Sequence, residues 1–517
     1  MKITAKVLLC MAVLFICLNA ELLNAGNIWI DGRGTSSTSG TWDSGIRSDT
    51  ETSIYPPYVK RWEKYEWRGE GGNVVPASGN YPLIYNGYVY FGEGNNSNTE
   101  PEKWYEPGYV WAWDIATGVT KTGYPLGPLD SGIISGGGGV VIGNDKLYAL
   151  TLQKLWGWDI SGEAPQLLTG FPVDVTETAG TDRTYLMNGL VYWGNKIYFC
   201  SQWKEGNTTN VKSYIYVKNG ITGEEEWRRE IATVGGGQTP AIWNGRVYVA
   251  GRGDGKIYCW DAETGADCAN FPVDVTGNMR AMPIIQEGKI YIGTHAGYFY
   301  RIDAVSGEID WFFETPIYIT QREEIVSTAS IWEDKVYFGS HRGALYGVYK
   351  DTGQSVPGFP TDYSLIIVVD GPISTANGVV YTVGSKYNAV DANNGNLLWE
   401  GQRVYRAGGV TYIYNYPSVT IGENEIVVVD GTLNSIICYE MPSPTVTATV
   451  TLTETASPTQ SPTFTATGTF TPSPSGTVTV TGTHTYTITP SMTVTLTATP
   501  SPTQPPPSMT VTPTITP

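Results

Sequence analysis

The sequence predicts an all-β protein built from one unit that is repeated along most of its length. Only 16% of the 517 residues are charged, whereas 61 are Gly, 34 are Tyr and 17 are Trp, a composition that favours strands and tight turns. A strand motif with a central Tyr returns about every 45 residues. In most units a polar turn that ends in Gly follows this strand, as expected for antiparallel hairpins.

The first 25 residues have the features of a secretory signal peptide. Lys2 and Lys6 precede an apolar run from Val7 to Leu18, and small residues follow at Ala20 and Ala25, either of which fits the cleavage site. The run is shorter than the roughly 20 residues that span a bilayer. We therefore expect an exported protein, secreted, displayed at the cell surface or periplasmic, with no transmembrane segment once the signal is removed.

After an N-terminal extension (residues 26–59), the repeated strand organises residues 60–441. Examples are "NGRVYVAG" at 244 and "EGKIYIG" at 287. The central residues are Tyr90, Tyr148, Tyr198, Tyr248, Tyr291, Tyr337, Tyr381 and Val427, with spacings of 58, 50, 50, 43, 46, 44 and 46. A period near 45 residues is typical of a propeller blade.

The turn that follows, such as "WDAETG" at 260, uses Asp to bond the backbone two residues on and Gly to adopt a left-handed conformation. The outer strand beyond it has two styles. Trp227, Trp311 and Trp399 stand four residues after the turn glycine, whereas other units end in sequences such as "GFPVDV". Both styles place an aromatic ring where blades meet, and such rings are buried only if the blades stack.

The two ends of the repeated region complement each other. The last unit, "SVTIGENEIVVVDGTLNSIICYE", stops before an outer strand, while "KRWEKYEWRGE" (60–70) resembles an outer strand with no blade before it. If the N-terminal strand completes the last blade, two exposed sheet edges disappear. We predict an eight-bladed β-propeller of four-stranded antiparallel blades. Seven blades, with the last unit as a partial strand extension, is the alternative.

The composition changes abruptly at the end of the propeller. Residues 442–517 consist mainly of Thr, Pro, Ser, Val and Ala, with Glu454 as the one acidic residue and no Lys or Arg. Such a segment buries too little apolar surface to fold and is expected to form a disordered stalk. The formal net charge of −17 excludes nucleic acid as an expected partner, because phosphate binding requires clustered basic residues.

The mature chain keeps four cysteines, and two of them flank the turn in "YCWDAETGADC". If Ala262 faces Gly265 across this turn, Cys259 lies directly opposite Cys268. Disulfides are permitted in exported proteins. A cross-strand disulfide between Cys259 and Cys268 is therefore predicted, with two free thiols as the alternative.

The segments "LYGVYKDTG", "YFYRIDAVSGEIDW" and "YNAVDANNGNLLW" resemble the pyrroloquinoline-quinone-like repeat family. This family contains the propellers of quinoprotein dehydrogenases and of the outer-membrane assembly scaffold lipoprotein, and the resemblance covers residues 60–440. For an enzyme it implies two adjacent cysteines above the quinone, a Trp below it and oxygen ligands for Ca²⁺. Because no two cysteines are adjacent, we expect no cofactor, no metal and no enzymatic activity. A quinone-type dehydrogenase, or another enzyme using the central channel, is the alternative.

Three motifs lie in loops at one end of the blades. His295 and His341 are 46 residues apart, one repeat, and Arg252 begins an Arg-Gly-Asp sequence in the same turn of an earlier unit. We interpret these residues as ordinary turn positions rather than as a metal site or an adhesion motif. The adjacent Glu323 and Glu324 are interpreted as a solvated charge pair rather than as a catalytic pair.

The loops that lead from each outer strand to the next blade ring one mouth of the channel in a propeller. Arginines and tyrosines there suit an acidic peptide or a glycan. We therefore predict a monomeric, non-catalytic binding or scaffolding module for protein or carbohydrate, with a structural surface protein as a further alternative. The candidate ligand residues are Arg183, Tyr185, Gln238, Asn278, Arg280, Arg322, Asp370, Arg406 and Tyr414.

Overall fold

The computed structural model describes residues 54–64, 81–93, 107–130, 139–151, 153–175, 183–187, 189–204, 211–231, 238–362, 371–383, 386–403, 419–430, 435–442, 449–455, 463–469 and 493–496. The chain divides into two compact units, Met1–Met441 and Pro442–Pro517. Residues 1–53 lie outside the described residues, so the signal peptide and most of the N-terminal extension stay predictions. No helix in the described part of the chain is long and apolar enough to cross a membrane.

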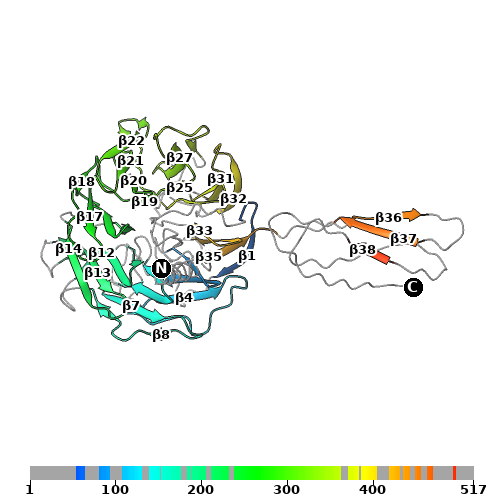
Figure 1. Cartoon of the computed structure of the whole chain (residues 1–517), viewed down its shortest axis with the longest axis horizontal. Helices are drawn as coiled ribbons and strands as arrows, with labels where there is room; N and C mark the ends of the chain where they lie inside the picture. Colours follow the sequence, from blue (N-terminus) through cyan, green and yellow to red (C-terminus); the bar gives the residue numbers. More distant parts are fainter. Residues whose placement is uncertain are drawn as a thin grey trace, which may run out of the picture. The chain divides into compact units, whose positions relative to one another are not determined.

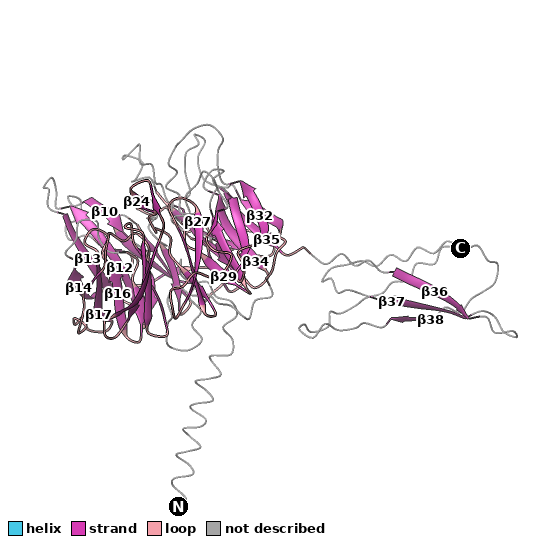
Figure 2. Ribbon diagram, turned by 90° about the horizontal axis from the view of Figure 1, so that it is seen from above, coloured by secondary structure: helices cyan, strands magenta, loops and turns pink. Residues whose placement is uncertain are grey.

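The first unit is an eight-bladed propeller of antiparallel sheets, as predicted, and Figure 1 shows the blades arranged in a ring. Figure 2 shows the propeller turned by 90°, so that the sheets are seen from the side. Strands β10 and β24 lie near the same edge of the ring in this view. The alternative of seven blades is excluded, because the last unit forms a complete sheet.

The strands follow one another from the inner to the outer edge of each blade. Blade 1 contains β2 (Leu83–Tyr85), β3 (Tyr88–Glu93) and β4 (Tyr109–Asp114), and two bridges to Thr120 and Leu126 mark its outer segment. Blade 2 contains β5 (Val140–Gly143), β6 (Lys146–Leu150), β7 (Lys154–Asp159), β8 (Gln166–Leu167) and β9 (Val173–Asp174). Blade 3 contains β10 (Arg183–Met187), β11 (Val191–Trp193), β12 (Lys196–Lys204), β13 (Val211–Asn219) and β14 (Glu225–Glu230). Blade 4 contains β15 (Ala241–Trp243), β16 (Arg246–Ala250), β17 (Lys256–Asp261) and β18 (Val273–Asp274).

Blade 5 contains β19 (Ile284–Gln286), β20 (Lys289–Gly293), β21 (Tyr298–Asp303) and β22 (Ile309–Glu314), and a small hairpin of β23 (Ile317–Tyr318) and β24 (Gln321–Arg322) follows it. Blade 6 contains β25 (Ser330–Trp332), β26 (Lys335–Gly339), β27 (Ala344–Tyr349) and β28 (Thr361–Asp362). Blade 7 contains β29 (Ser374–Ala376), β30 (Val379–Val383), β31 (Lys386–Asp391) and β32 (Leu397–Arg403). Blade 8 contains β33 (Val419–Ile421), β34 (Glu425–Asp430), β35 (Ser435–Glu440) and, from the N-terminal side, β1 (Val59–Lys64).

Ring closure by the N-terminal strand is confirmed. Strand β1 pairs antiparallel with β35, from Val59 opposite Glu440 to Lys64 opposite Ile436. The guanidinium of Arg61 contacts carboxylate oxygens of Glu425 (2.8 Å) and Glu440 (2.6 Å) across this joint. The outer edge of the last blade is therefore covered by a strand from the opposite end of the repeated region.

The repeated tyrosine has a structural role in joining the blades. The phenol of Tyr148 in blade 2 is fully buried and donates a hydrogen bond to the backbone carbonyl of Gly220 in the turn of blade 3, 2.6 Å away. The same bond from one blade to the next joins Tyr198 to Ala262 (3.0 Å), Tyr248 to Ala304 (2.7 Å) and Tyr337 to Ala392 (2.6 Å). A Tyr rather than a Phe recurs in these units because its hydroxyl satisfies a buried carbonyl.

The polar turn has the geometry that its sequence predicts. In blade 4 the carboxylate of Asp261 accepts hydrogen bonds from the backbone N–H of Glu263 (3.1 Å) and of Thr264 (2.8 Å). Gly265 ends the turn with a φ of 69°, and the indole of Trp227 from blade 3 lies against it. The turn therefore closes a hairpin and also receives the aromatic ring of the preceding blade.

Cys259 and Cys268 form a disulfide bond, with Cα atoms 5.4 Å apart. Trp260 forms a bridge with Asp267, which is the register that places the two cysteines opposite each other. Cys200 and Cys438 are buried free thiols in blades 3 and 8, and burial raises the pKa of both.

In the second unit the structure describes three strands, β36 (Thr449–Thr455), β37 (Thr463–Thr469) and β38 (Thr493–Leu496). β36 pairs antiparallel and β38 pairs parallel with β37. The composition alone predicts a stalk without secondary structure. The strands form where Thr alternates with residues such as Val and Leu, and both kinds of residue favour extended backbone.

Candidate ligand site at the mouth of the propeller

Two sets of loops meet at one edge of blades 4 to 6. Because consecutive strands of a blade are antiparallel, the turn between its second and third strands lies at the same edge as the loop leaving its outer strand. Backbone hydrogen bonds join the two sets: His295 N–H donates to the carbonyl of Asn278, and His341 N–H donates to that of Glu324, both at 2.8 Å. We call this edge the mouth.

Three adjacent blades bring a basic residue to the same position at the mouth. Arg252, His295 and His341 each stand four residues after the buried Tyr of their blade. Arg280, from the loop between blades 4 and 5, is also an electrostatic neighbour of His295. The spacing of one repeat between the histidines thus reflects a shared place in the fold.

His295 lies at the centre of this group. Its Nδ1 atom is 3.4 Å from a carboxylate oxygen of Glu324. Burial and the positive charge of Arg280 lower the pKa of His295, with further lowering from Arg252 and His341, while Glu324 acts in the opposite direction. The imidazole is therefore neutral near pH 7, and the proton on Nδ1 is the one that faces Glu324.

The other ring nitrogen of His295 is an unsatisfied acceptor. Nε2 is buried and has no hydrogen-bond partner among the described residues. Buried polar atoms are nearly always paired, so an unpaired one at a loop edge marks a place where a ligand or a water binds. The charged groups acting on this ring include two guanidinium groups and one carboxylate. The mouth therefore combines cationic donors with one acceptor nitrogen.

The predicted mouth residues divide into three groups. Asn278 is exposed and Arg280 half-buried at the mouth, whereas Gln238 is buried and its side chain donates to the carbonyl of Met279, 3.2 Å away. Arg322 points to the flank of blade 5, where its guanidinium donates to the carbonyl of Thr315 and pairs with the carboxylate of Glu314. The structure describes the backbone of Arg183 and Tyr185 in β10 but not their side chains, and Asp370, Arg406 and Tyr414 lie outside the described residues.

The other motifs at this edge have structural partners. The carboxylate of Asp254, in the Arg-Gly-Asp sequence, accepts hydrogen bonds from the Tyr258 hydroxyl (2.5 Å) and from the Lys256 N–H (3.1 Å). Glu323 accepts a hydrogen bond from the Tyr346 hydroxyl, 2.9 Å away. Asp254 is thus held within its own turn, and Glu323 and Glu324 have separate partners rather than acting as a pair.

The cysteines do not fit the quinone site that the family resemblance implies. That site requires two adjacent cysteines, whereas Cys259 bonds to a cysteine nine residues away and Cys200 and Cys438 lie in different blades. Within the described ranges no group of three or more His, Cys, Asp or Glu side chains is placed to hold a metal ion.

Two features of the structure, the pairing of Glu324 with His295 and a groove on blade 5, were not predicted from the sequence. The pairing of Glu324 with His295 depends on a loop conformation that no local pattern encodes. The second is a groove on blade 5, which has a signal in the sequence: the outer strand "DWFFE" carries aromatic residues on both faces, whereas the corresponding "EWRRE" of blade 3 does not.

Comparison with known proteins agrees with the fold. Residues 212–441 match the family model described as outer membrane protein assembly factor BamB. The quinohemoprotein alcohol dehydrogenase of Comamonas testosteroni is 12% identical, with 85% of each chain covered and a TM-score of 0.56. The quinohemoprotein alcohol dehydrogenase ADHIIG of Pseudomonas putida HK5 is 13% identical, with 80% of each chain covered and a TM-score of 0.55. BamB of Moraxella catarrhalis is 16% identical over 58% of this chain and 96% of its own, with a TM-score of 0.42. No curated protein matches the sequence.

Proposed function

Because the chain carries the PQQ-like repeats of the BamB-like β-propeller family, we propose that it is an exported, non-catalytic module that binds an acidic group of a protein or glycan at the mouth. The observation that carries this proposal is that Arg252 and Arg280 act electrostatically on His295, whose buried Nε2 atom has no partner among the described residues. The signal peptide supports export.

The chemistry of the mouth favours an anionic ligand. A guanidinium group binds carboxylate, phosphate or sulfate through paired N–H donors, and such charge-assisted bonds are stronger than neutral ones. A bound anion also favours protonation of His295, which turns Nε2 from an acceptor into a donor. An acidic ligand would therefore satisfy the unpaired nitrogen and offset the mutual repulsion of the basic groups.

A non-catalytic role is supported by the donor set of the described residues. The cysteine arrangement does not fit a quinone floor. The carboxylate of Glu323 accepts from a tyrosine and that of Glu324 faces a histidine, so neither is poised with the other for acid/base chemistry. Binding is the function that this arrangement performs without further groups.

Titration of the full chain with two acidic polymers, poly-glutamate and polygalacturonate, tests the proposal by calorimetry. We expect one of them to bind, with an affinity that falls as salt rises and falls roughly tenfold or more in Arg280→Ala. Arg228→Ala removes a half-buried arginine of blade 3, away from the mouth, and serves as the matched control. If neither polymer binds, or if both variants bind as the parent does, the mouth is not the site.

A second titration addresses catalysis directly. We expect pyrroloquinoline quinone with Ca²⁺ to leave the melting temperature of the full chain unchanged. Stoichiometric binding with a higher melting temperature would contradict the non-catalytic assignment, because a ligand that binds only the folded state stabilises it.

A further inference from the structure

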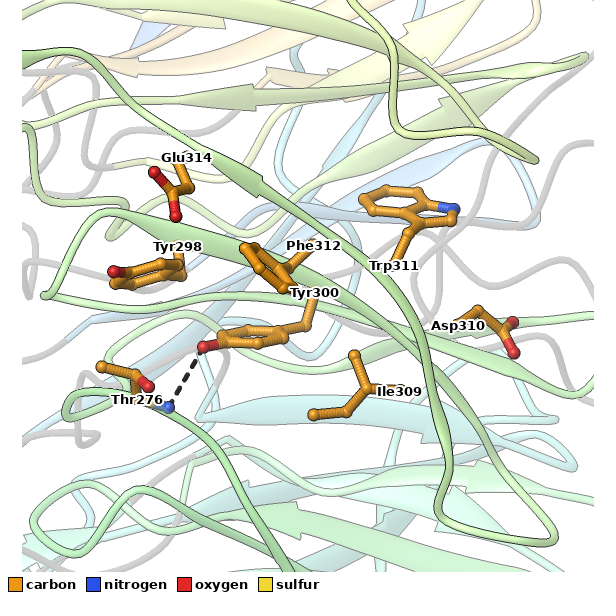
Figure 3. Close-up of a pocket in the computed structure, with 8 residues that line it drawn as sticks. All are labelled: Thr276, Tyr298, Tyr300, Ile309, Asp310, Trp311, Phe312 and Glu314. Atoms are coloured by element: carbon orange, nitrogen blue, oxygen red, sulfur yellow. Dashed lines mark hydrogen bonds between the residues drawn. The ribbon is translucent and has the colours of Figure 1, made fainter.

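A groove with a volume of about 710 Å³ opens on the outer flank of blade 5, where the outer end of blade 4 meets it (Figure 3). Thr276 lies on the blade 4 side, and the blade 5 side includes Tyr298, Tyr300, Phe312 and Glu314. We propose that this groove is a second binding site, independent of the mouth, for a neutral carbohydrate chain.

Three aromatic rings form a platform in the groove. Tyr298 and Tyr300 lie on the same face of β21, and Phe312 of β22 lies opposite Tyr300. The ring centroids are 6.0 Å apart for Tyr298 and Tyr300, 5.9 Å for Tyr298 and Phe312, and 6.0 Å for Tyr300 and Phe312. Phe312 is 54% exposed to solvent and Tyr298 is half-buried, whereas Tyr300 is only 4% exposed. Phe312 therefore supplies most of the accessible apolar surface of the platform.

The fold does not require an aromatic residue at this position. In the four blades whose outer strand carries Trp, the residue after the Trp is Glu63, Arg228, Phe312 or Glu400. In blade 3 the guanidinium of Arg228 lies 5.5 Å from the ring of Tyr214, and in blade 7 Glu400 forms a salt bridge with Lys386. Blades 3 and 7 therefore place a charged side chain at this position, and in blade 8 the Glu63 side chain is nearly buried and accepts a hydrogen bond from Ser435. The exposed ring of blade 5 indicates a contact surface.

The charges around the groove favour a neutral ligand. The carboxylate of Asp310 contacts the ammonium of Lys289 (2.9 Å) and the guanidinium of Arg301 (3.2 Å). Glu314 pairs with Arg322, whose guanidinium also lies 5.4 Å from the centre of the Tyr298 ring. Both carboxylates are thus neutralised by the protein, and the cation position beside Tyr298 is already filled. A charged ligand would therefore find no unpaired opposite charge among the described residues that line the groove.

The polar groups beside the platform favour a sugar over an apolar peptide. The hydroxyl of Tyr300 accepts a hydrogen bond from the N–H of Thr276 (3.2 Å), which leaves its own proton without an acceptor among the residues that the structure describes. The hydroxyls of Tyr298 and Thr276 also form no hydrogen bond with any residue that the structure describes. Apolar side chains would cover these groups without pairing them, at a cost in affinity. A sugar ring has an apolar C–H face for the aromatic rings and a hydroxyl edge for these partners.

The groove has the dimensions of a ligand site. Small-molecule sites are concave, about 300–1,000 Å³ in volume, and combine apolar walls with a few polar groups. The groove also lies on the flank of the propeller, whereas His295 and Arg280 lie at the mouth. The two sites are therefore separable by mutation.

Calorimetric titration of the full chain with cellohexaose, chitohexaose and mannohexaose tests the inference. We expect at least one hexasaccharide to bind, and Phe312→Arg to weaken binding roughly tenfold or more, because it places the charged residue of blade 3 on the platform. Blade 3 already carries this arrangement, so the variant is expected to fold, and thermal melting checks it. Arg228→Ala, at the same position in blade 3, and Arg280→Ala, at the mouth, are expected to bind normally.

Three results would overturn the inference. The first is that none of the three hexasaccharides binds the protein at millimolar concentration. The second is that a hexasaccharide binds Phe312→Arg as well as it binds the parent. The third is that a decaproline peptide binds the protein and no sugar does. If Arg280→Ala abolishes sugar binding while Phe312→Arg does not, the sugar belongs to the mouth. That result would remove the second site while supporting the proposed function.

Discussion

The indole nitrogen of Trp62 donates a hydrogen bond to the backbone carbonyl of Ile115, 2.8 Å away. Trp62 belongs to the strand that closes the ring, and Ile115 lies in the turn of blade 1. The same bond joins Trp227 of blade 3 to Ala262 of blade 4 (3.1 Å) and Trp311 of blade 5 to Lys350 of blade 6 (3.0 Å). The closing joint is therefore built like the other blade interfaces.

Removal of this joint is expected to destabilise the propeller. Trp62 is 9% exposed, and truncation of a buried aromatic side chain costs about 3–5 kcal/mol. Trp62→Ala should therefore lower the melting temperature clearly, as measured by circular dichroism. Tyr55→Ala removes a side chain that is 44% exposed in the same segment and should have little effect. Equal melting temperatures for Trp62→Ala and the parent would contradict a stabilising role for the closing strand.

The disulfide of blade 4 makes a separate prediction. Closing a loop of this length stabilises a folded chain by about 2–3 kcal/mol in the loop-entropy treatment. The double variant Cys259→Ser, Cys268→Ser should therefore unfold at lower urea concentration than the oxidised parent. A reductant should destabilise the parent but not the double variant, because Cys200 and Cys438 are already thiols. A parent insensitive to reductant would show that the bond contributes no stability.

Two glycines of blade 4 allow the stability cost of backbone strain to be measured separately from the cost of disturbed packing. Gly265 and Gly245 have similar φ angles, 69° and 71°. A Cβ atom on Gly265 would lie 2.7 Å from an atom of the Trp227 ring, whereas one on Gly245 would meet nothing within 4 Å. Gly245→Ala should cost about 1–2 kcal/mol for the left-handed backbone alone, and Gly265→Ala should cost more. Chemical unfolding of both variants measures the difference, and equal losses would show that the indole can move aside.

His295 predicts a pH dependence of stability. Its pKa in the folded protein lies below the value of about 6.5 that the unfolded chain has. As the pH falls through 6.5, the unfolded chain takes up a proton before the folded one does, so stability is complete above this pH and declines towards the lower folded pKa. His295→Gln should reduce this decline in urea unfolding between pH 5 and 7. The aspartates with lowered pKa, such as Asp261 and Asp303, titrate at lower pH and do not interfere. An unchanged pH profile in the variant would contradict the prediction.

The sequence reveals the repeated architecture because each blade must satisfy the same interface. The buried tyrosines set the period, and the unpaired outer strand around Trp62 predicts how the ring closes. The position of Cys259 opposite Cys268 follows from the geometry of the turn that connects two antiparallel strands. These features depend on local periodicity, which a single sequence displays.

The details of the two sites depend on contacts between loops and are harder to predict. Arg322 lies in a loop that leads to the mouth, yet its guanidinium turns to Glu314 and Thr315 on the flank. Glu324 faces His295 only because the loop between blades 5 and 6 places it there. Phe312 is one of three consecutive aromatic residues in its strand, but its exposure depends on how blade 5 packs against its neighbour, which a single sequence does not display.

The pairing of β1 with β35 constrains the order in which the protein is assembled. Arg61 and Glu425, which meet at this joint, are 364 residues apart in the chain. A chain that is synthesised from its N-terminus produces β1 first, and β1 finds its partner only after the other blades exist. The first strand of the propeller to be made therefore cannot pair until residues 435–440 have been made, and closure of the ring requires nearly the whole propeller sequence.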